Sequence, residues 1–134
     1  MGVTARDLSQ QSLAAVRAKD RATWLGLFAP DALVEDPVGK SVLDPTGNGH
    51  RGPQAIAAFF DTVIAPQKRF DYEIRQSFLC ANEVANVCHF DIVTGPDDRE
   101  IKVDLVVVYR MNENGKIANL RAFWEAAKIP GMAL

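Results

Sequence analysis

An aspartate stands between an apolar run and a proline in the stretch "LVEDPVG", residues 33–39. The carboxylate of Asp36 can serve two purposes there. It can form a turn that faces water, as aspartates at the start of loops commonly do. It can instead act as a general base at the mouth of a pocket, where burial disfavours the charged form and the substrate proton lies within reach. The residues alone leave both interpretations open.

The histidines and cysteines are not spaced for metal or covalent chemistry. His50 falls in a loop and His89 in a strand-like run, and neither has a second ligand at zinc-site spacing. Cys80 and Cys88 occupy apolar, strand-like stretches without a Cys-x-x-Cys pair, so we expect buried, reduced thiols. We expect neither a metal site nor a cofactor.

Length and charge narrow the class of protein. With 134 residues, 48% of them hydrophobic, the chain has the size of one domain, residues 1–134, with a core that needs no disulfides. The formal net charge is -2, from 15 basic and 17 acidic residues that are interspersed, which argues against a nucleic-acid partner. No apolar run of about 18 residues and no signal-like N-terminus is present, so we expect a cytoplasmic protein without membrane attachment.

Helices are predicted in the first half of the chain. Thr4 and Asp7 have nearly the spacing of a capping box, and Asp20 can cap a second, short helix. Pro53 suits the first turn of a third helix, which Pro66 ends. The expected helices cover residues 4–19, 20–29 and 53–65.

Strands are predicted mainly in the second half, where apolar residues alternate with polar ones. The expected strands cover residues 32–36, 70–79, 84–93, 101–110 and 117–126. Helices before strands favour an α+β domain in which helices cover one face of a curved antiparallel sheet. If the two layers do not close completely, an apolar pocket remains between them.

Alternation also assigns the two faces of the last two strands. The face expected to line the pocket carries Val103, Leu105, Val107, Tyr109, Ala118, Leu120, Ala122 and Trp124. The opposite face has apolar centres inside charged margins and carries Lys102, Asp104, Val106, Val108, Arg110, Asn119, Arg121 and Glu125. That composition suits the interface of a homodimer.

Four stretches, "LFAPDALVEDPVG", "GPQAIAAFF", "YRMNENGKI" and "RAFWE", occur in the order and near the spacing found in the ketosteroid isomerases. The chain resembles this family, part of the nuclear transport factor 2-like superfamily, over most of its length. The loop "GKSVLDPTGNGHRG" is similar to that of an actinobacterial, mycobacterial-type branch. The resemblance implies a cone-shaped fold of about three helices on a curved sheet, with Asp36 as the general base.

The same resemblance breaks where the family stabilises the substrate oxygen. In the family, a Tyr and a protonated Asp hold the dienolate that forms when the base removes a proton next to a ketone. Ser12 and Val107 occupy those two positions here, and Phe28 and Phe60 replace two supporting tyrosines. Losing such a donor typically costs about a hundred- to a thousandfold in rate, so another donor serves or catalysis is slow. Replacement candidates are Ser12, Tyr72, Tyr109, the Trp124 indole and a water molecule.

Trp124 in "RAFWE" resembles the isomerase tryptophan that lines the pocket beside the base, where an indole N–H can orient a carboxylate. The residues expected to bind a fused-ring ligand are Trp124, Phe28, Val38, Phe59, Phe60, Phe90, Val107 and Ser12. The ligand is expected to be small, hydrophobic and steroid-like.

Two classes of function remain open. One is an enzyme in which Asp36 shuttles a proton in a steroid or similar polycyclic ketone, or acts as the base of a polyketide cyclase. The other is a binding protein that sequesters steroids or similar lipophiles without turnover. Retention of Asp36 favours the enzyme, whereas Ser12 and Val107 favour the binder. The sequence also leaves open whether the loop between Pro37 and Gly52 is a mobile lid or a fixed wall.

Overall fold

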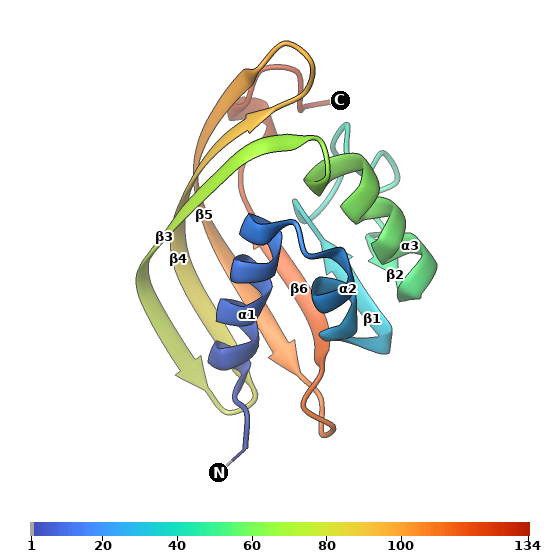
Figure 1. Ribbon diagram of the computed structural model, residues 1–134, viewed down its shortest axis with the longest axis vertical. Helices are drawn as coiled ribbons and strands as arrows, with labels where there is room; N and C mark the ends of the chain where they lie inside the picture. The colour runs from blue at the N-terminus through green and yellow to red at the C-terminus, as the bar shows by residue number, and fades with distance from the viewer. Residues whose placement is uncertain (1) are drawn as a thin grey trace.

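A curved six-stranded sheet wraps around helix α1 in the computed structural model, which describes residues 2–134 (Figure 1). The helices are α1 (Ala5–Ala18), α2 (Arg21–Gly26), α3 (Gly52–Phe59), the π-helical turn η1 (Phe60–Ile64) and the 3-10 turn η2 (Ala126–Lys128). The strands are β1 (Phe28–Glu35), β2 (His50–Arg51), β3 (Gln67–Cys80), β4 (Glu83–Thr94), β5 (Arg99–Met111) and β6 (Ile117–Phe123), in the sheet order β2-β1-β6-β5-β4-β3. The predicted α+β class, with helices on one face of a curved sheet, is confirmed.

Local hydrogen bonds and backbone conformation define both ends of helix α1. The Asp7 backbone N–H donates to Thr4 Oγ1 at 3.2 Å, and the Thr4 N–H donates to Asp7 Oδ2 at 2.8 Å, so the predicted capping box is present. The helix ends at Ala18, because the next residue, Lys19, has a left-handed φ of 54° that stops propagation. The apolar face of α1, which packs toward the sheet, carries Leu8, Leu13 and Val16 among its buried residues.

Strand β1 differs from the prediction in length and in pairing. It begins at Phe28 rather than at residue 32 and includes Pro30, which the structure accommodates beside a register irregularity between Phe28 and Leu33. Strand β1 also pairs parallel with β6, so the sheet is mixed rather than wholly antiparallel. Because the long intervening chain connects these two strands, no hairpin dictates their relative direction.

The long strands β3, β4 and β5 form two hairpins whose curvature comes partly from β3. Its pairing with β4 shifts register between Gln67 and Arg69 and again between Ile74 and Gln76. Such bulges bend a strand and increase its twist. The sheet therefore closes around the helices instead of lying flat against them (Figure 1).

The two thiols have different surroundings. Cys88 is buried, and burial raises the pKa of its thiol to about 11, so it stays protonated. Cys80 is exposed at the end of β3, so the prediction that both thiols are buried is wrong for Cys80. Apolar neighbours in the sequence suggested burial, but Cys80 shares a face of β3 with Phe78, which is 54% exposed.

None of the helices in residues 2–134 is long and apolar enough to cross a membrane. These residues also bring together no group of three or more His, Cys, Asp or Glu side chains able to hold a metal ion.

Candidate functional site

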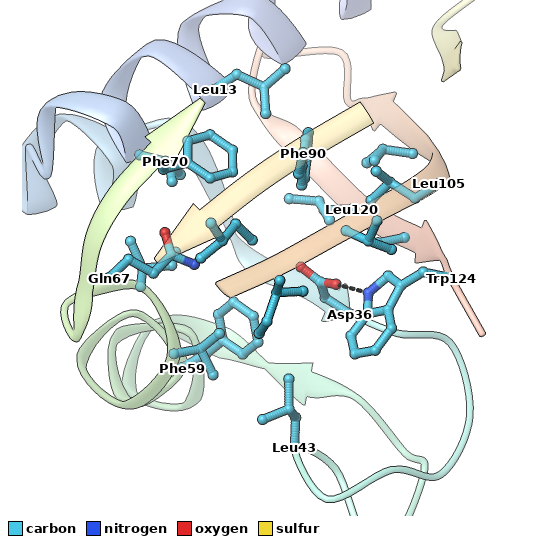
Figure 2. A pocket seen from close by; sticks show the side chains of 18 of the residues that line it. Leu13, Asp36, Leu43, Phe59, Gln67, Phe70, Phe90, Leu105, Leu120 and Trp124 are labelled. Carbon is cyan, nitrogen blue, oxygen red and sulfur yellow. Dashed lines mark hydrogen bonds between the residues drawn. The ribbon is translucent and has the colours of Figure 1, made fainter. Parts of the chain in front are cut away.

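A cavity of about 250 Å³ lies between the helices and the concave face of the sheet (Figure 2). Helices α1, α2 and α3 with η1 supply one wall, and strands β3 to β6 supply the other. Its apolar lining includes Leu13, Val16, Phe59, Phe70, Phe90, Ile92, Val103, Leu105, Val107, Leu120, Ile129 and Met132. Its few polar groups are therefore the ones able to orient a ligand.

Asp36 is the one carboxylate among the residues that line this cavity. It follows β1 directly, and it is partly buried where it borders the cavity. Burial raises the pKa of its carboxyl to about 6, although a hydrogen bond from Trp124 acts in the opposite direction. A carboxyl of this pKa can both take and return a proton near neutral pH.

Trp124 holds the Asp36 carboxylate by a short hydrogen bond. The indole Nε1–H donates to Asp36 Oδ1 at 2.6 Å (Figure 2). Strands β1 and β6 run parallel and pair Glu35 with Arg121, so they end on the same side of the sheet. Asp36 and Trp124 follow these two strands and are therefore brought together. The bond favours the charged carboxylate and fixes its orientation.

A second polar group in the cavity is built around Ser12 on α1. Tyr109 of β5 donates its hydroxyl hydrogen to Ser12 Oγ at 3.0 Å, and the Trp24 indole N–H donates to the same oxygen at 3.1 Å. Burial, together with the nearby charge of Asp36, raises the pKa of Tyr109, so its phenol stays protonated. Ser12, Trp24, Tyr109 and Asp36 all border the one cavity.

The structure brings most of the predicted ligand-contacting residues to the cavity. Ser12, Phe59, Phe90, Val107 and Trp124 line it together with Asp36. The alternation assigned to β5 and β6 is also confirmed for every pocket-facing residue named except Ala118.

Three predicted residues do not line the cavity. The rings of Phe28 and Phe60 lie behind Trp24, with centroids 4.7 Å and 5.6 Å from its indole, so Trp24 takes the cavity-facing position. Val38 lies beyond Asp36, where its backbone N–H donates to the Ala122 carbonyl at 2.9 Å. Sequence position alone could not reveal that an indole would cover both phenylalanines.

The glycine-rich loop forms a hydrogen-bonded wall beside the cavity. Within it, buried Asp44 accepts a hydrogen bond from the Gly49 N–H at 2.8 Å, while the Val42 N–H donates to the Met132 carbonyl at 2.9 Å. This contact brings Leu43 of the loop and Met132 of the C-terminal segment to the cavity. Neither residue could be predicted from the sequence as part of the site, because no periodic pattern links a loop to a distant segment of the chain.

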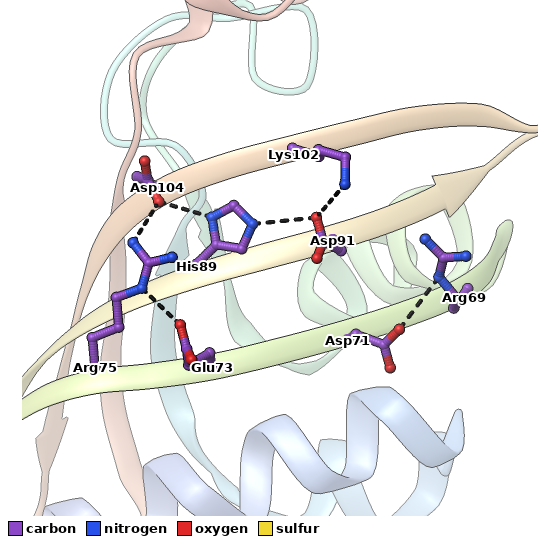
Figure 3. Close-up of polar contacts among 8 residues, drawn as sticks. All are labelled: Arg69, Asp71, Glu73, Arg75, His89, Asp91, Lys102 and Asp104. Carbon is purple, nitrogen blue, oxygen red and sulfur yellow. Dashed lines mark hydrogen bonds and ion pairs between the residues drawn. The ribbon is translucent and has the colours of Figure 1, made fainter.

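The other face of the sheet carries a charged cluster (Figure 3). Asp104 points there, as alternation predicted, and its carboxylate lies 2.8 Å from His89 Nδ1 and 3.2 Å from Arg75 Nη1. Hydrogen bonding to Asp104, reinforced by Asp91, raises the pKa of His89. Asp104 therefore cannot replace the oxyanion donor that Val107 lacks, because the sheet separates it from the cavity.

The family model for the SnoaL-like domain matches residues 9–120. The chain belongs to this SnoaL-like family. Among relatives of this SnoaL-like chain, the steroid Delta-isomerase of Nocardioides simplex is 29% identical over 114 residues, which are 84% of this chain and 82% of the relative.

Two solved structures show the same architecture. The Delta 5-3-ketosteroid isomerase from Mycobacterium sp. is 35% identical, with a TM-score of 0.86 over 98% of each chain. A Mycobacterium tuberculosis protein in complex with estradiol-17beta-hemisuccinate is 36% identical, with a TM-score of 0.85 over 97% of this chain and 98% of that one. The resemblance to ketosteroid isomerases within the nuclear transport factor 2-like superfamily is thereby confirmed.

The Trp124 hydrogen bond generates a testable pKa difference. In a Trp124→Phe variant we expect the Asp36 pKa to rise above about 6, because the lost indole favoured the charged carboxylate. Carbon-13 NMR titration of the Asp36 carboxyl measures this midpoint. Trp24→Phe is the matched control, since the Trp24 indole bonds Ser12 and not Asp36. An unchanged midpoint in Trp124→Phe would contradict the role of the bond.

Proposed function

We propose that this protein is a cofactor-independent isomerase that moves a double bond in a steroid or similar polycyclic ketone, with Asp36 as the general base. The observation that carries the proposal is a carboxyl with a pKa of about 6, held by an indole, at the wall of an apolar cavity. Steroid-isomerase relatives and a relative solved with a steroid derivative support the substrate class.

In this mechanism, the Asp36 carboxylate takes a proton from the carbon between the ketone and an isolated double bond. The electron pair of that C–H bond forms a new C=C bond, and the ketone π electrons move to oxygen, giving a dienolate. Asp36 then returns the proton to the far carbon of the former double bond, the carbonyl reforms, and the product is a conjugated ketone. Atoms and electrons balance without a cofactor or a metal.

The dienolate oxygen needs a hydrogen-bond donor, and the proposal assigns that role to Ser12. Its Oγ already accepts hydrogen bonds from Tyr109 and Trp24, so both of its lone-pair directions are occupied. Its own O–H is then the group left to donate, and Ser12 borders the cavity. Two donors on the oxygen also polarise the O–H and strengthen it as a donor.

A non-catalytic steroid binder or a polyketide cyclase is the alternative. Val107 favours it, because an apolar side chain stands where the resembled isomerases place their protonated Asp. The binder and the isomerase share the cavity and differ in whether Asp36 removes a proton. Turnover therefore separates them, and affinity alone does not.

The base assignment predicts the behaviour of an Asp36→Asn variant. With a β,γ-unsaturated 3-ketosteroid, formation of the conjugated ketone should vanish, while product affinity stays within a few fold because the amide has nearly the same shape. Turnover by the unaltered protein should rise with pH through about 6, since only the deprotonated carboxyl is a base. Ultraviolet absorbance of the conjugated ketone measures both. Equal turnover in the two proteins would overturn the assignment, and none in either, at concentrations where the steroid binds, would favour the alternative.

The donor assignment predicts a second kinetic effect. Ser12→Ala should lower kcat by about a hundredfold, with KM changed much less, because the bond strengthens as charge develops on the oxygen. Ser9→Ala is the matched control, since Ser9 is a buried serine of the same helix that does not border the cavity. Equal kcat in Ser12→Ala and the unaltered protein would remove Ser12 from the mechanism.

We also propose that the chain forms a homodimer through the sheet face opposite the cavity. Phe123 of β6 is 42% exposed on that face and pairs across the strands with Val106 of β5, which lies two residues after Asp104 of the charged cluster in Figure 3. An apolar centre with a charged margin is typical of such interfaces.

Light scattering at micromolar concentration tests this assembly. The unaltered protein should have about twice the chain mass, and Val106→Glu should have the monomer mass, because a charge would be buried in the contact. Val42→Glu, at an exposed position of the loop beside the cavity, should remain dimeric. A monomer in the unaltered protein would contradict the proposal.

A further inference from the structure

Gln67 is a buried polar side chain on the cavity wall whose amide oxygen has no partner. The residue is only 7% exposed, it borders the cavity, and its Oε1 accepts no hydrogen bond within residues 2–134. A buried acceptor left unpaired is costly, so native proteins rarely keep one without a reason. Because most side chains around it are apolar, the amide is one of the few groups in the cavity that can hydrogen-bond a ligand.

The backbone is bent so that Gln67 points inward. Phe70 and Tyr72 alternate toward the interior, which would place Gln67 on the outer face of a regular strand. Between the pairs Gln67↔Thr94 and Arg69↔Val93, however, β3 advances by two residues and β4 by one. The extra residue, Lys68, forms a bulge, and bulges commonly re-aim a side chain beside a functional site.

The re-aimed Gln67 stands directly opposite Thr94, another polar residue that borders the cavity. In Figure 2, Gln67 lies on the far side of the cavity from Trp124 and Asp36, and the apolar rings of Phe59, Phe70 and Phe90 are among the side chains around the cavity. The cavity thus has a carboxylate at one end, an amide at the other and mainly apolar walls.

We propose that the Gln67 amide oxygen accepts a hydrogen bond from a hydroxyl on the ligand, at the end remote from the ketone that faces Asp36. This inference rests on the proposed function for the ketone end and adds a second anchor to it. The ligand class is then a rigid polycyclic hydroxy ketone rather than a hydrocarbon-ended ketone. A ligand without the hydroxyl would keep the buried amide oxygen unpaired, which is how such sites reject analogues.

The test compares two conjugated 3-ketosteroids that are identical except for a hydroxyl at carbon 17, the end of the ring system remote from the ketone. Isothermal titration calorimetry gives their affinities for the full chain, without requiring turnover. We expect the hydroxylated steroid to bind about tenfold more tightly, as one satisfied buried hydrogen bond implies. In Gln67→Leu, the two steroids should bind equally.

Matched variants separate this effect from general damage to the cavity. Gln76→Leu changes an exposed glutamine of the same strand and should keep the preference for the hydroxyl. Gln67→Met, a flexible apolar replacement of similar length, should lose it as Gln67→Leu does, which provides a second folded variant. Thermal unfolding should show both Gln67 variants at least as stable as the unaltered protein, because an unpaired buried amide has been removed.

Several results would overturn the inference: an equal preference in Gln67→Leu and the unaltered protein, no preference in the unaltered protein, or no binding of either steroid. Failure of the proposed isomerase activity looks different. In that case turnover is missing, but the Gln67-dependent preference persists in the calorimeter, as it should also in Asp36→Asn. The two failures are therefore distinguishable.

Discussion

The hydrogen bond between the Trp124 indole and the Asp36 carboxylate is the interaction on which the chemistry of the cavity depends. Burial drives the carboxyl toward its neutral form, and the indole partly reverses that, leaving a pKa of about 6. Deeper burial without the indole would give a permanently protonated acid, whereas an ion pair would give a weak base. The parallel pairing of β1 with β6 makes this contact possible, because both strands then end on the same side of the sheet.

Polar groups are few in this cavity, and because they lie apart, each can bind a different part of a ligand. Asp36 and the Ser12 hydroxyl, with Tyr109 and Trp24 donating to the serine, are the groups suited to the ketone of the proposed substrate. Gln67 comes from the bulged start of β3 and faces the space from another side. In an apolar cavity, the affinity for a ligand comes mainly from contacts with the apolar side chains, whereas the few hydrogen bonds fix the orientation of the ligand. A ligand that satisfies both ends can lie in one direction only.

Much of the layout could be predicted from the sequence, because it follows from local rules. The Thr4 capping box, the inward face of β5 and the outward direction of Asp104 each depend on neighbours a few residues away. What failed depends on departures from regularity or on distant contacts. Alternation cannot foresee the bulge at Lys68 that turns Gln67 inward, nor can it foresee that Trp24 covers Phe28 and Phe60.

In the proposed mechanism, the substitutions at the two donor positions change how the dienolate oxygen is stabilised. A Tyr or a protonated Asp donates with a naturally acidic hydrogen, whereas a serine hydroxyl is intrinsically weaker. In this protein the serine oxygen accepts two hydrogen bonds, and acceptance at the oxygen strengthens donation by its hydrogen. In the proposed mechanism the phenol therefore acts through the serine instead of on the substrate, and burial, which raises the pKa of Tyr109, keeps the phenol protonated. Because a serine hydroxyl is a weaker donor than a phenol or a protonated carboxyl, the proposed mechanism predicts slower turnover than direct donation by those groups would give.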